Sequence, residues 1–407
     1  MEKEKLIIKN FGPIKSISLD LGKFNVLIGE QATGKSTVAK VLAVCRYFSY
    51  IALDSTEDYG ESRFSEGLTA WGLNEALKED SLIIYECRHY SLTVNQIPNI
   101  IKGNVIQSFN NLKLRERFNF RPSLKAVSPE FKALLVELKK IWRPTLRVAG
   151  VLENRLPTSF FQNDVAAVMD NPFYLPAERG LQSIFSLGRS SIENISDSLF
   201  NQFARLDQIT RLFKNDTIIE PLQIVYKNVE GRGYIRKNNE EEFYSLYNAA
   251  SGYQSTIPVV LLSKYYSEIR QKSKTFFIEE PELNLFPNAQ QKLMQYLVDS
   301  VINYKNSILL TTHSPYILSS LNNLMYSYQI GQLHKEKVNE VIEEKYWINP
   351  KDVSAYLLKY DGTQKGVVHE DILDKDGMIK ADKIDGVSAI LNSDFNAIMD
   401  IELNIKK

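Results

Sequence analysis

The sequence predicts an α/β fold with a mixed β-sheet core and an inserted helical lobe. Apolar runs typical of buried strands end in polar residues at three places along the chain, residues 24–28, 275–278 and 307–312. Between about residues 100 and 215 the pattern changes to longer helical segments separated by prolines, which indicates the lobe. We expect one unit over residues 1–407, with the lobe inserted at 100–215 and a C-terminal tail, 345–407, packed on it.

The N-terminal part of the chain predicts three short strands followed by a helix. The strands are expected where β-forming residues flank turn residues, at Leu6–Lys9, Ser16–Leu19 and Phe24–Ile28. A helical pattern then begins at Lys35 and ends at about Ile51.

Two further segments favour strands or hairpins. Ser81–Val94 alternates in part and is rich in β-forming residues. Glu230 and Gly231 form a turn signal between Leu222–Tyr226 and Gly233–Arg236, which predicts a hairpin.

The segment GEQATGKST, Gly29–Thr37, matches the pattern Gly-x4-Gly-Lys-Ser. A strand before it and a helix after it are the context of a phosphate loop. Its glycines let backbone N–H groups face a polyphosphate, and the helix adds its positive end. Lys35 and the Ser36 hydroxyl would meet the terminal phosphates and Mg²⁺. We therefore predict a nucleotide site formed by Gly29, Gln31, Ala32, Thr33, Gly34, Lys35, Ser36 and Thr37.

Two adjacent carboxylates, Glu279 and Glu280, end the second apolar run. Ligands of open α/β sheets bind at the carboxyl ends of strands. In a nucleotide site Glu279 would hold Mg²⁺ through water, and Glu280 would accept a proton from the attacking water. A solvated strand end is the alternative, and the phosphate loop upstream favours the functional interpretation.

Two weaker signals accompany the acidic pair. His313 follows the third apolar run, and at a strand end it is expected to sense the γ-phosphate, although an isolated histidine is more often structural. Ser251 and Gly252 begin a helical pattern and would offer N–H groups and a hydroxyl to an anion. A plain helix cap would look the same, and taken alone the cap is favoured.

The charge pattern leaves nucleic-acid binding open. The formal net charge is zero, so no whole-molecule field draws the chain to nucleic acid or an acidic membrane. Locally, Lys113–Arg147 carries ten basic residues against three acidic ones. This segment is either a solvated helical face or a contact surface for nucleic acid or an acidic partner.

Cysteine use and hydropathy predict a cytoplasmic protein with no membrane partner. No signal-peptide core or membrane span is found, because the long uncharged runs are interrupted by polar residues. The two cysteines, Cys45 and Cys87, are expected to be buried thiols, and with four histidines they make no zinc pattern.

Taken in order, these pieces resemble the ABC-type ATPase superfamily, in its RecF/SMC-like branch. The Walker A motif matches Gly29–Ser36, the signature motif resembles Ala250–Gln254, the Walker B motif matches Phe276–Glu280, and the switch histidine matches His313. The opening IIKNFGPIKSISLDL and the strings TTHSP and IEEPE resemble the ATPase module of the overcoming-lysogenization-defect nucleases and related stand-alone prokaryotic ATPases, several of which act in phage defence.

The sequence departs from this family in several places. Its signature is ASGYQ rather than Leu-Ser-Gly-Gly-Gln, and Glu279 stands where Asp is usual. Tyr174–Arg179 is similar to the glutamine-loop region, with Glu178 in the metal-facing role, whereas its plain interpretation is a turn with a surface ion pair. Asp374-Lys375-Asp376 is interpreted as an acidic turn, so the chain resembles the ATPase without the TOPRIM nuclease domain.

The resemblance implies a function, cofactors and partners. ATP and Mg²⁺ would be bound by the phosphate loop of one subunit, with Ser36 and Glu279 toward the metal, and capped by Ser251 and Gly252 of another. The partners implied are further copies of the chain, as a dimer or higher homo-oligomer. Glu280 and His313 would be catalytic, and hydrolysis would change the assembly.

The resemblance further implies that this assembly senses a trigger and controls a separate effector, such as a nuclease, in anti-phage defence. Three alternatives stay open. They are a RecF-like DNA-repair clamp, which makes DNA a further candidate partner, a transporter's nucleotide-binding subunit, and a non-hydrolysing ATP-bound scaffold.

Overall fold

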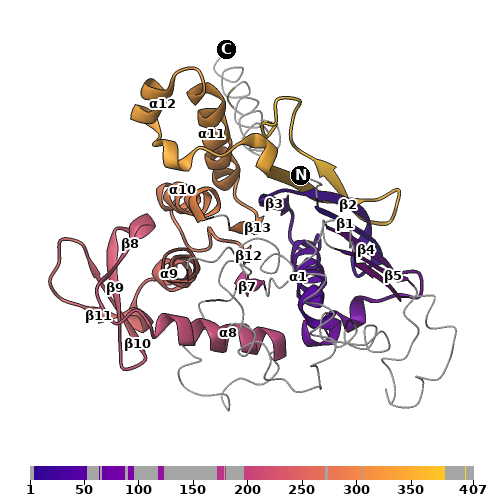
Figure 1. Ribbon diagram of the computed structural model, residues 1–407, viewed down its shortest axis with the longest axis horizontal. Helices are drawn as coiled ribbons and strands as arrows, with labels where there is room; N and C mark the ends of the chain where they lie inside the picture. Colours follow the sequence, from indigo (N-terminus) through magenta and orange to yellow (C-terminus); the bar gives the residue numbers. More distant parts are fainter. Residues whose placement is uncertain are drawn as a thin grey trace, which may run out of the picture.

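The computed structural model describes most of the chain outside the predicted lobe. The described residues are 4–52, 64, 67–87, 90–95, 118–122, 172–177, 179, 197–270, 274–304, 306–380 and 399. Figure 1 shows a large sheet with helices on both of its faces and a small sheet to one side.

Eleven strands of the described chain form the large sheet. They are β1 (Glu4–Phe11), β2 (Ile14–Leu21), β3 (Phe24–Gly29), β4 (Leu82–Glu86), β5 (Tyr90–Asn95), β6 (Phe118–Pro122), β7 (Phe173–Leu175), β12 (Thr275–Glu279), β13 (Ser307–Thr312), β14 (Val353–Asp361) and β15 (Gly366–Asp371). Their order across the sheet is β6-β5-β4-β1-β2-β15-β14-β3-β13-β12-β7.

The large sheet has a parallel part and a mainly antiparallel part. Strands β7, β12, β13, β3 and β14 run parallel, so their carboxyl ends meet at one edge. Strands β2, β1, β4, β5 and β6 pair antiparallel, and the β14–β15 hairpin joins the two parts. The predicted α/β fold with a mixed sheet is therefore confirmed.

The described helices are α1 (Lys35–Ala52), α8 (Asp197–Thr210), α9 (Ser251–Lys264), α10 (Pro287–Tyr304), α11 (Pro315–Gly331) and α12 (Lys335–Val341). A π-helical turn, Tyr265–Ile269, continues α9. Short 3-10 turns lie at Asn74–Ala76, Glu220–Leu222, Leu246–Asn248, Glu344–Tyr346 and Pro350–Asp352.

Each face of the large sheet has its own apolar core, because successive side chains of a strand point to opposite faces. On β12, Phe276 and Ile278 pack with the residues of α9, α10 and α11, whereas Phe277 packs with those of α1 and β1. In Figure 1 α1 accordingly lies on the side away from α9 and α10. Covering on both faces explains why β12 and β13 have buried side chains at nearly every position.

The small sheet has the order β11-β10-β9-β8, with β8 at Thr217–Ile219, β9 at Ile224–Val229, β10 at Arg232–Lys237 and β11 at Tyr244–Ser245. The predicted hairpin is confirmed as β9–β10, and its turn residues Glu230 (φ 51°) and Gly231 (φ 84°) both have positive φ. Of the strand or hairpin predicted for Ser81–Val94, the structure has two antiparallel strands, β4 and β5.

The expected helical lobe, 100–215, and the expected tail, 345–407, both contain strands of the large sheet. Residues 118–122 and 173–175, inside the range expected to be a helical lobe, form β6 and β7, while α8 is helical as expected. The first part of the expected tail forms β14 and β15 in the middle of the sheet. Their backbones pair with β3 and β2. Because most of 100–215 and of 381–407 lies outside the described residues, the division itself stays a prediction.

Candidate functional site

The phosphate loop lies at the carboxyl edge of the parallel strands, between β3 and α1. Its two glycines are required by close approach. A Cβ at Gly29 would overlap the carbonyl oxygen of Leu358, and one at Gly34 (φ 79°) would lie 2.9 Å from the Pro13 ring. Ala32 also has positive φ, 61°. The loop is thus packed tightly against β14 and the β1–β2 turn, and a side chain at either glycine would disturb it.

Lys35 is folded back over this loop. Its Nζ donates hydrogen bonds to the carbonyl oxygens of Gly29 (2.9 Å) and Glu30 (2.8 Å), and the residue is 6 % exposed. Burial lowers the pKa of the ammonium, and the charges of Glu280, Glu282 and Glu279 offset part of that effect. An anion bound beside this desolvated ammonium would favour its charged form, so the position suits a phosphate.

Glu279, the last residue of β12 and the first acid of the pair, is buried and held by two donors. The Tyr174 hydroxyl donates to Oε1 at 2.6 Å, and the Ala177 N–H donates to Oε2 at 3.2 Å. Each carboxylate oxygen keeps a further lone pair, so a water ligand of a metal can still be accepted. Together with the exposed Ser36, the donor set is oxygen only and fits Mg²⁺.

Glu280, the second acid, is oriented by its backbone. Its φ is 43°, its N–H donates to the Thr311 carbonyl oxygen at 2.8 Å, and its side chain is 31 % exposed. Oε1 of Glu280 lies 3.4 Å from Nε2 of His313. The structure therefore brings together Lys35, Glu279, Glu280 and His313 at one edge of the sheet, as the sequence predicted, while their roles stay predictions.

Glu282 belongs to the same cluster and was missed by sequence reasoning. Its Oε1 accepts hydrogen bonds from the Thr312 hydroxyl (2.6 Å) and the His313 N–H (2.9 Å). Its Oε2 is buried and has no hydrogen-bond partner among the described residues. The third carboxylate of the string EEPE was the signal that could have revealed it.

Ser251 and Gly252 start α9, and their setting differs from a plain cap. The N-cap residue is Ala250, which makes no side-chain hydrogen bond, and Ser251 is exposed in the first turn. A Cβ at Gly252 would lie 2.6 Å from the Asn284 carbonyl oxygen, so α9 packs closely on the segment after the acidic pair. Among the described contacts, no hydrogen bond or ion pair joins Ser251 or Gly252 to the phosphate loop.

Arg179 contradicts the plain interpretation of Tyr174–Arg179 as a turn with a surface ion pair. The residue is 0 % exposed, and its guanidinium donates to backbone carbonyl oxygens of both β12 and α9. No pattern in the sequence indicates these bonds, because the acceptors are backbone atoms far away along the chain. Glu178, expected to face the metal, lies outside the described residues.

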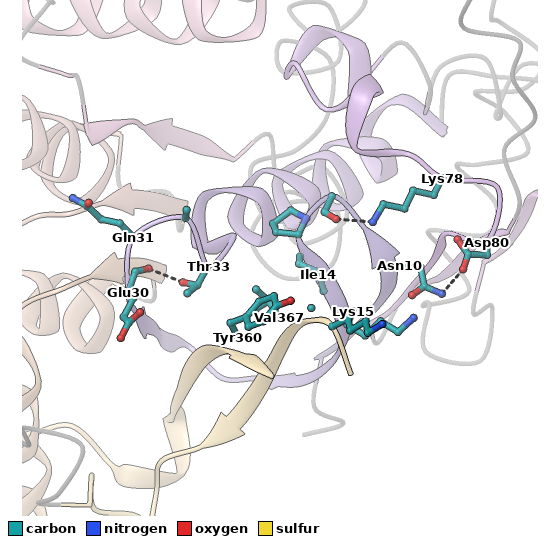
Figure 2. A pocket seen from close by; sticks show the side chains of 15 residues that line it. Asn10, Ile14, Lys15, Glu30, Gln31, Thr33, Lys78, Asp80, Tyr360 and Val367 are labelled. Carbon is teal, nitrogen blue, oxygen red and sulfur yellow. Dashed lines mark hydrogen bonds between the residues drawn. The ribbon is translucent and has the colours of Figure 1, made fainter. Parts of the chain in front are cut away.

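A cavity of about 580 Å³ adjoins the outer side of the phosphate loop. Its walls are the loop itself, the β1–β2 turn and the β14–β15 hairpin, as Figure 2 shows. Tyr360 and Val367 lie between the loop and Lys15 in that view, and Lys78 donates to the Gly12 carbonyl oxygen at 2.9 Å. The sequence does not predict this cavity, since its lining comes from four distant segments, the fourth being Lys78 and Asp80.

The remaining predicted features are placed as follows. Cys45 is fully buried, where desolvation raises the pKa of its thiol, but Cys87 is only half-buried. Asp374–Gly377 forms the expected turn, with the Asp374 side chain accepting from two backbone N–H groups. The side chains of the basic segment Lys113–Arg147 lie outside the described residues.

Two features are absent from the described part of the chain. No group of three or more His, Cys, Asp or Glu side chains in it is arranged to hold a metal ion directly. None of its helices combines the length and apolar character needed to cross a bilayer.

The family described as AAA ATPase domain matches two overlapping segments of the sequence, residues 1–91 and 79–318. The chain belongs to this family. The match confirms the expected ATPase class. No curated protein matches the sequence.

Three solved SMC head domains are similar to the chain. One, bound to the C-winged helix domain of ScpA, has a TM-score of 0.45 and 9 % identity over 91 % of this chain and 98 % of that one. One from Thermotoga maritima has a TM-score of 0.40 and 9 % identity over 92 % and 100 %. One with an extended coiled coil, bound to the C-terminal domain of ScpA derived from Pyrococcus furiosus, has a TM-score of 0.37 and 10 % identity over 100 % and 99 %.

Proposed function

We propose that the protein binds and hydrolyses ATP at the edge formed by β3, β12 and β13, and that ATP joins two copies of the chain. The observation that carries the proposal is the convergence of Lys35, Glu280 and His313. Glu280 lies 3.4 Å from His313, and its charge acts on Lys35. A desolvated ammonium, a partly exposed carboxylate and an imidazole at one point suit phosphoryl transfer to water.

Each side chain then has a distinct task. The loop N–H groups and Lys35 bind the phosphates, and Ser36 with Glu279 would hold Mg²⁺, which neutralises charge on the phosphates when bound. Glu280 accepts the proton of the attacking water, because it is the acid of the pair that reaches solvent. His313 contacts the γ-phosphate. Its backbone N–H donates to Glu282, which keeps the histidine in place beside the phosphate.

The nucleoside part of ATP occupies the cavity next to the loop. The cavity is continuous with the loop residues Glu30–Thr33, so a ligand whose phosphates lie on the loop extends into it. Its volume of about 580 Å³ lies in the range of small-molecule sites, roughly 300–1,000 Å³. The exposed ring of Tyr360 offers a surface on which a base can stack.

A second copy supplies Ser251 and Gly252. At the start of α9 the N–H groups of Tyr253 and Gln254 donate to the Ala250 carbonyl oxygen, whereas those of Ser251 and Gly252 have no acceptor within the helix, and Ser251 is exposed. These groups suit the γ-phosphate bound by a neighbour, which accounts for the lack of a described contact with the phosphate loop of the same chain. The assembly is a homodimer or a higher oligomer built from such pairs.

The wider role extends this proposal. On the family resemblance, the ATP-driven change of assembly senses a trigger and controls a separate effector, such as a nuclease, in defence against phage. Neither of the two cysteines, both of which are described, forms a disulfide, which suits the reducing cytoplasm. This extension is tested by purifying the Glu280→Gln protein with ATP and identifying what accompanies it.

Mixing inactive variants tests the shared site. Lys35→Ala removes the phosphate-binding half, and Ser251→Arg blocks the α9 half. Each alone should show only background hydrolysis, whereas an equal mixture should recover about a quarter of the wild-type rate, since half of the pairs are mixed and each has one complete site. Lys35→Ala mixed with Glu280→Gln is the matched control and should stay inactive, because both changes lie in the same half. Full activity of Ser251→Arg by itself would contradict the sharing.

A further inference from the structure

A buried arginine connects the two halves of the proposed site within one subunit. Arg179 donates from Nε to the Ser255 carbonyl oxygen at 2.7 Å, in α9. Its Nη1 donates to the carbonyl oxygen of Glu279 (2.6 Å) and its Nη2 to that of Glu280 (2.8 Å), at the end of β12. A further bond to Pro176, 3.2 Å, fixes the arginine to its own turn. One rigid planar group thus joins the acidic strand end to the start of α9.

Ser255 makes a second connection between the same elements. Its hydroxyl donates to the carbonyl oxygen of Leu283 at 2.9 Å, three residues after Glu280, and it is 2 % exposed. The Gly252 backbone packs against Asn284 next to it. The first turn of α9 is therefore fixed to both sides of Glu280, by Arg179 on one side and by Ser255 on the other.

Buried hydrogen bonds from a charged donor are stronger than those between neutral groups, so the connection is stiff. The guanidinium fork has fixed geometry, unlike a lysine ammonium, and holds several acceptors at set positions. A shift of the Glu279–Glu280 backbone must then move the Ser255 carbonyl oxygen, and with it Ser251 and Gly252.

We infer that Arg179 is a positioning residue that couples the nucleotide state of one ATP site to the placement of α9 in the neighbouring site. The inference rests on the proposed function and adds to it. When ATP occupies the loop and engages Glu280, Arg179 carries the adjustment to the α9 turn that caps the other nucleotide. The two sites of a pair thereby respond to each other.

Hydrogen exchange in a monomeric background tests the coupling without a partner. In Ser251→Arg, ATP should slow exchange of the backbone amides in the first two turns of α9 by about 5-fold or more. Adding Arg179→Lys should reduce that slowing to about 2-fold or less while ATP affinity stays within about 3-fold. A purely structural role would change exchange equally with and without ATP. Equal ATP-dependent slowing with and without Arg179→Lys would overturn the inference.

Arg205→Lys is the matched control. Arg205 is a half-buried arginine on α8 that lies over the Phe173 and Tyr266 rings and donates a hydrogen bond to the Tyr266 hydroxyl, and among the described contacts it has none with Glu279 or Glu280. It should leave the ATP-dependent slowing unchanged. If Arg179→Lys fails to fold, Ser255→Ala keeps the arginine and removes the hydroxyl bond to Leu283, and it should weaken the slowing to an intermediate value.

The mixing experiment gives the functional readout. Arg179→Lys placed in a Glu280→Gln subunit, which binds ATP but contributes only α9 to the complete site formed with Ser251→Arg, should lower hydrolysis by about 5- to 100-fold. Arg205→Lys in the same subunit should have no effect, and an equal result for both would count against the coupling. If the unmodified mixture is inactive but ATP still slows α9 exchange in a way that depends on Arg179, the proposed sharing of the ATP site is contradicted. The coupling through Arg179 is then still supported.

Discussion

The hydroxyl of Tyr174 donates a hydrogen bond of 2.6 Å to Oε1 of Glu279, joining the edge strand β7 to the acidic end of β12. Both residues are buried, and the Tyr174 ring packs on Trp71 and Phe277. The bond fixes the carboxylate of Glu279 while leaving lone pairs for a water ligand. The orientation of the proposed Mg²⁺ site therefore depends on a tyrosine more than a hundred residues earlier in the chain.

Tyr174→Phe keeps the ring and removes only this bond. We expect the free energy of unfolding to fall by about 1–3 kcal/mol, because a buried carboxylate loses a donor. The Mg²⁺ concentration for half-maximal hydrolysis should also rise. Urea unfolding and a Mg²⁺ titration measure the two effects. Tyr226→Phe, in the small sheet, removes a buried hydroxyl that contacts Asn228 and should change stability alone. An unchanged Mg²⁺ requirement in Tyr174→Phe would argue against the metal role of Glu279.

Glu280→Gln separates hydrolysis from binding. The amide cannot accept the proton of the water, so the rate should fall by about 10² to 10⁴ while ATP still binds. Lys35→Ala should lose ATP binding itself, since it removes the ammonium over the loop. Phosphate release and equilibrium binding of a fluorescent ATP analogue distinguish the two variants. Equal loss of binding in both would refute the role of Glu280 as the base.

Glu282 is expected to act through His313. Glu282→Ala leaves the Thr312 hydroxyl and the His313 N–H without their acceptor and should lower kcat by about 10- to 100-fold, with ATP affinity little changed. Glu282→Gln keeps a carbonyl oxygen for both donors and should retain most of the activity. If Glu282→Gln is as impaired as Glu282→Ala, the charge and not the positioning of His313 matters.

ATP affinity should decrease at alkaline pH earlier than for an ordinary lysine site. Burial lowers the pKa of Lys35 from its usual 10.5, and bound phosphates favour the charged form. Affinity is therefore complete below the pKa of Lys35 in the free protein and is lost as pH rises through it. Binding curves between about pH 7 and pH 10.5 measure the loss. A Lys35→Arg protein, if it binds ATP, should lack this slope because arginine stays charged, and a matching slope would assign the effect to another group.

Local patterns predicted the parts of the site that lie within a few residues of one another. The phosphate loop, the Glu279–Glu280 pair and His313 each follow a buried strand, and strand ends of a parallel sheet meet at one edge. The strands and the β9–β10 hairpin were predictable for the same reason, because turn residues and apolar runs are short-range signals.

Long-range contacts were not predictable from one sequence. Arg179 donates hydrogen bonds to residues 76 and 100 positions away. No residue pattern indicates these bonds, because the acceptors are backbone carbonyl oxygens. Glu282 contacts His313 31 residues later, and the β14–β15 hairpin enters the sheet between β3 and β2 through backbone pairing alone. These features depend on which strands become neighbours, and periodicity within a segment does not determine that.

The most direct test of the shared ATP site is the molar mass of Glu280→Gln, measured by size separation with light scattering, with and without ATP and Mg²⁺. The chain mass is 46.6 kDa. A shared ATP site predicts a monomer without ATP and, with ATP, a dimer or an assembly of several dimers. Adding Lys35→Ala should abolish this increase in mass. A mass that is the same with and without ATP, in a protein that binds ATP, would contradict the claim that the nucleotide joins two copies.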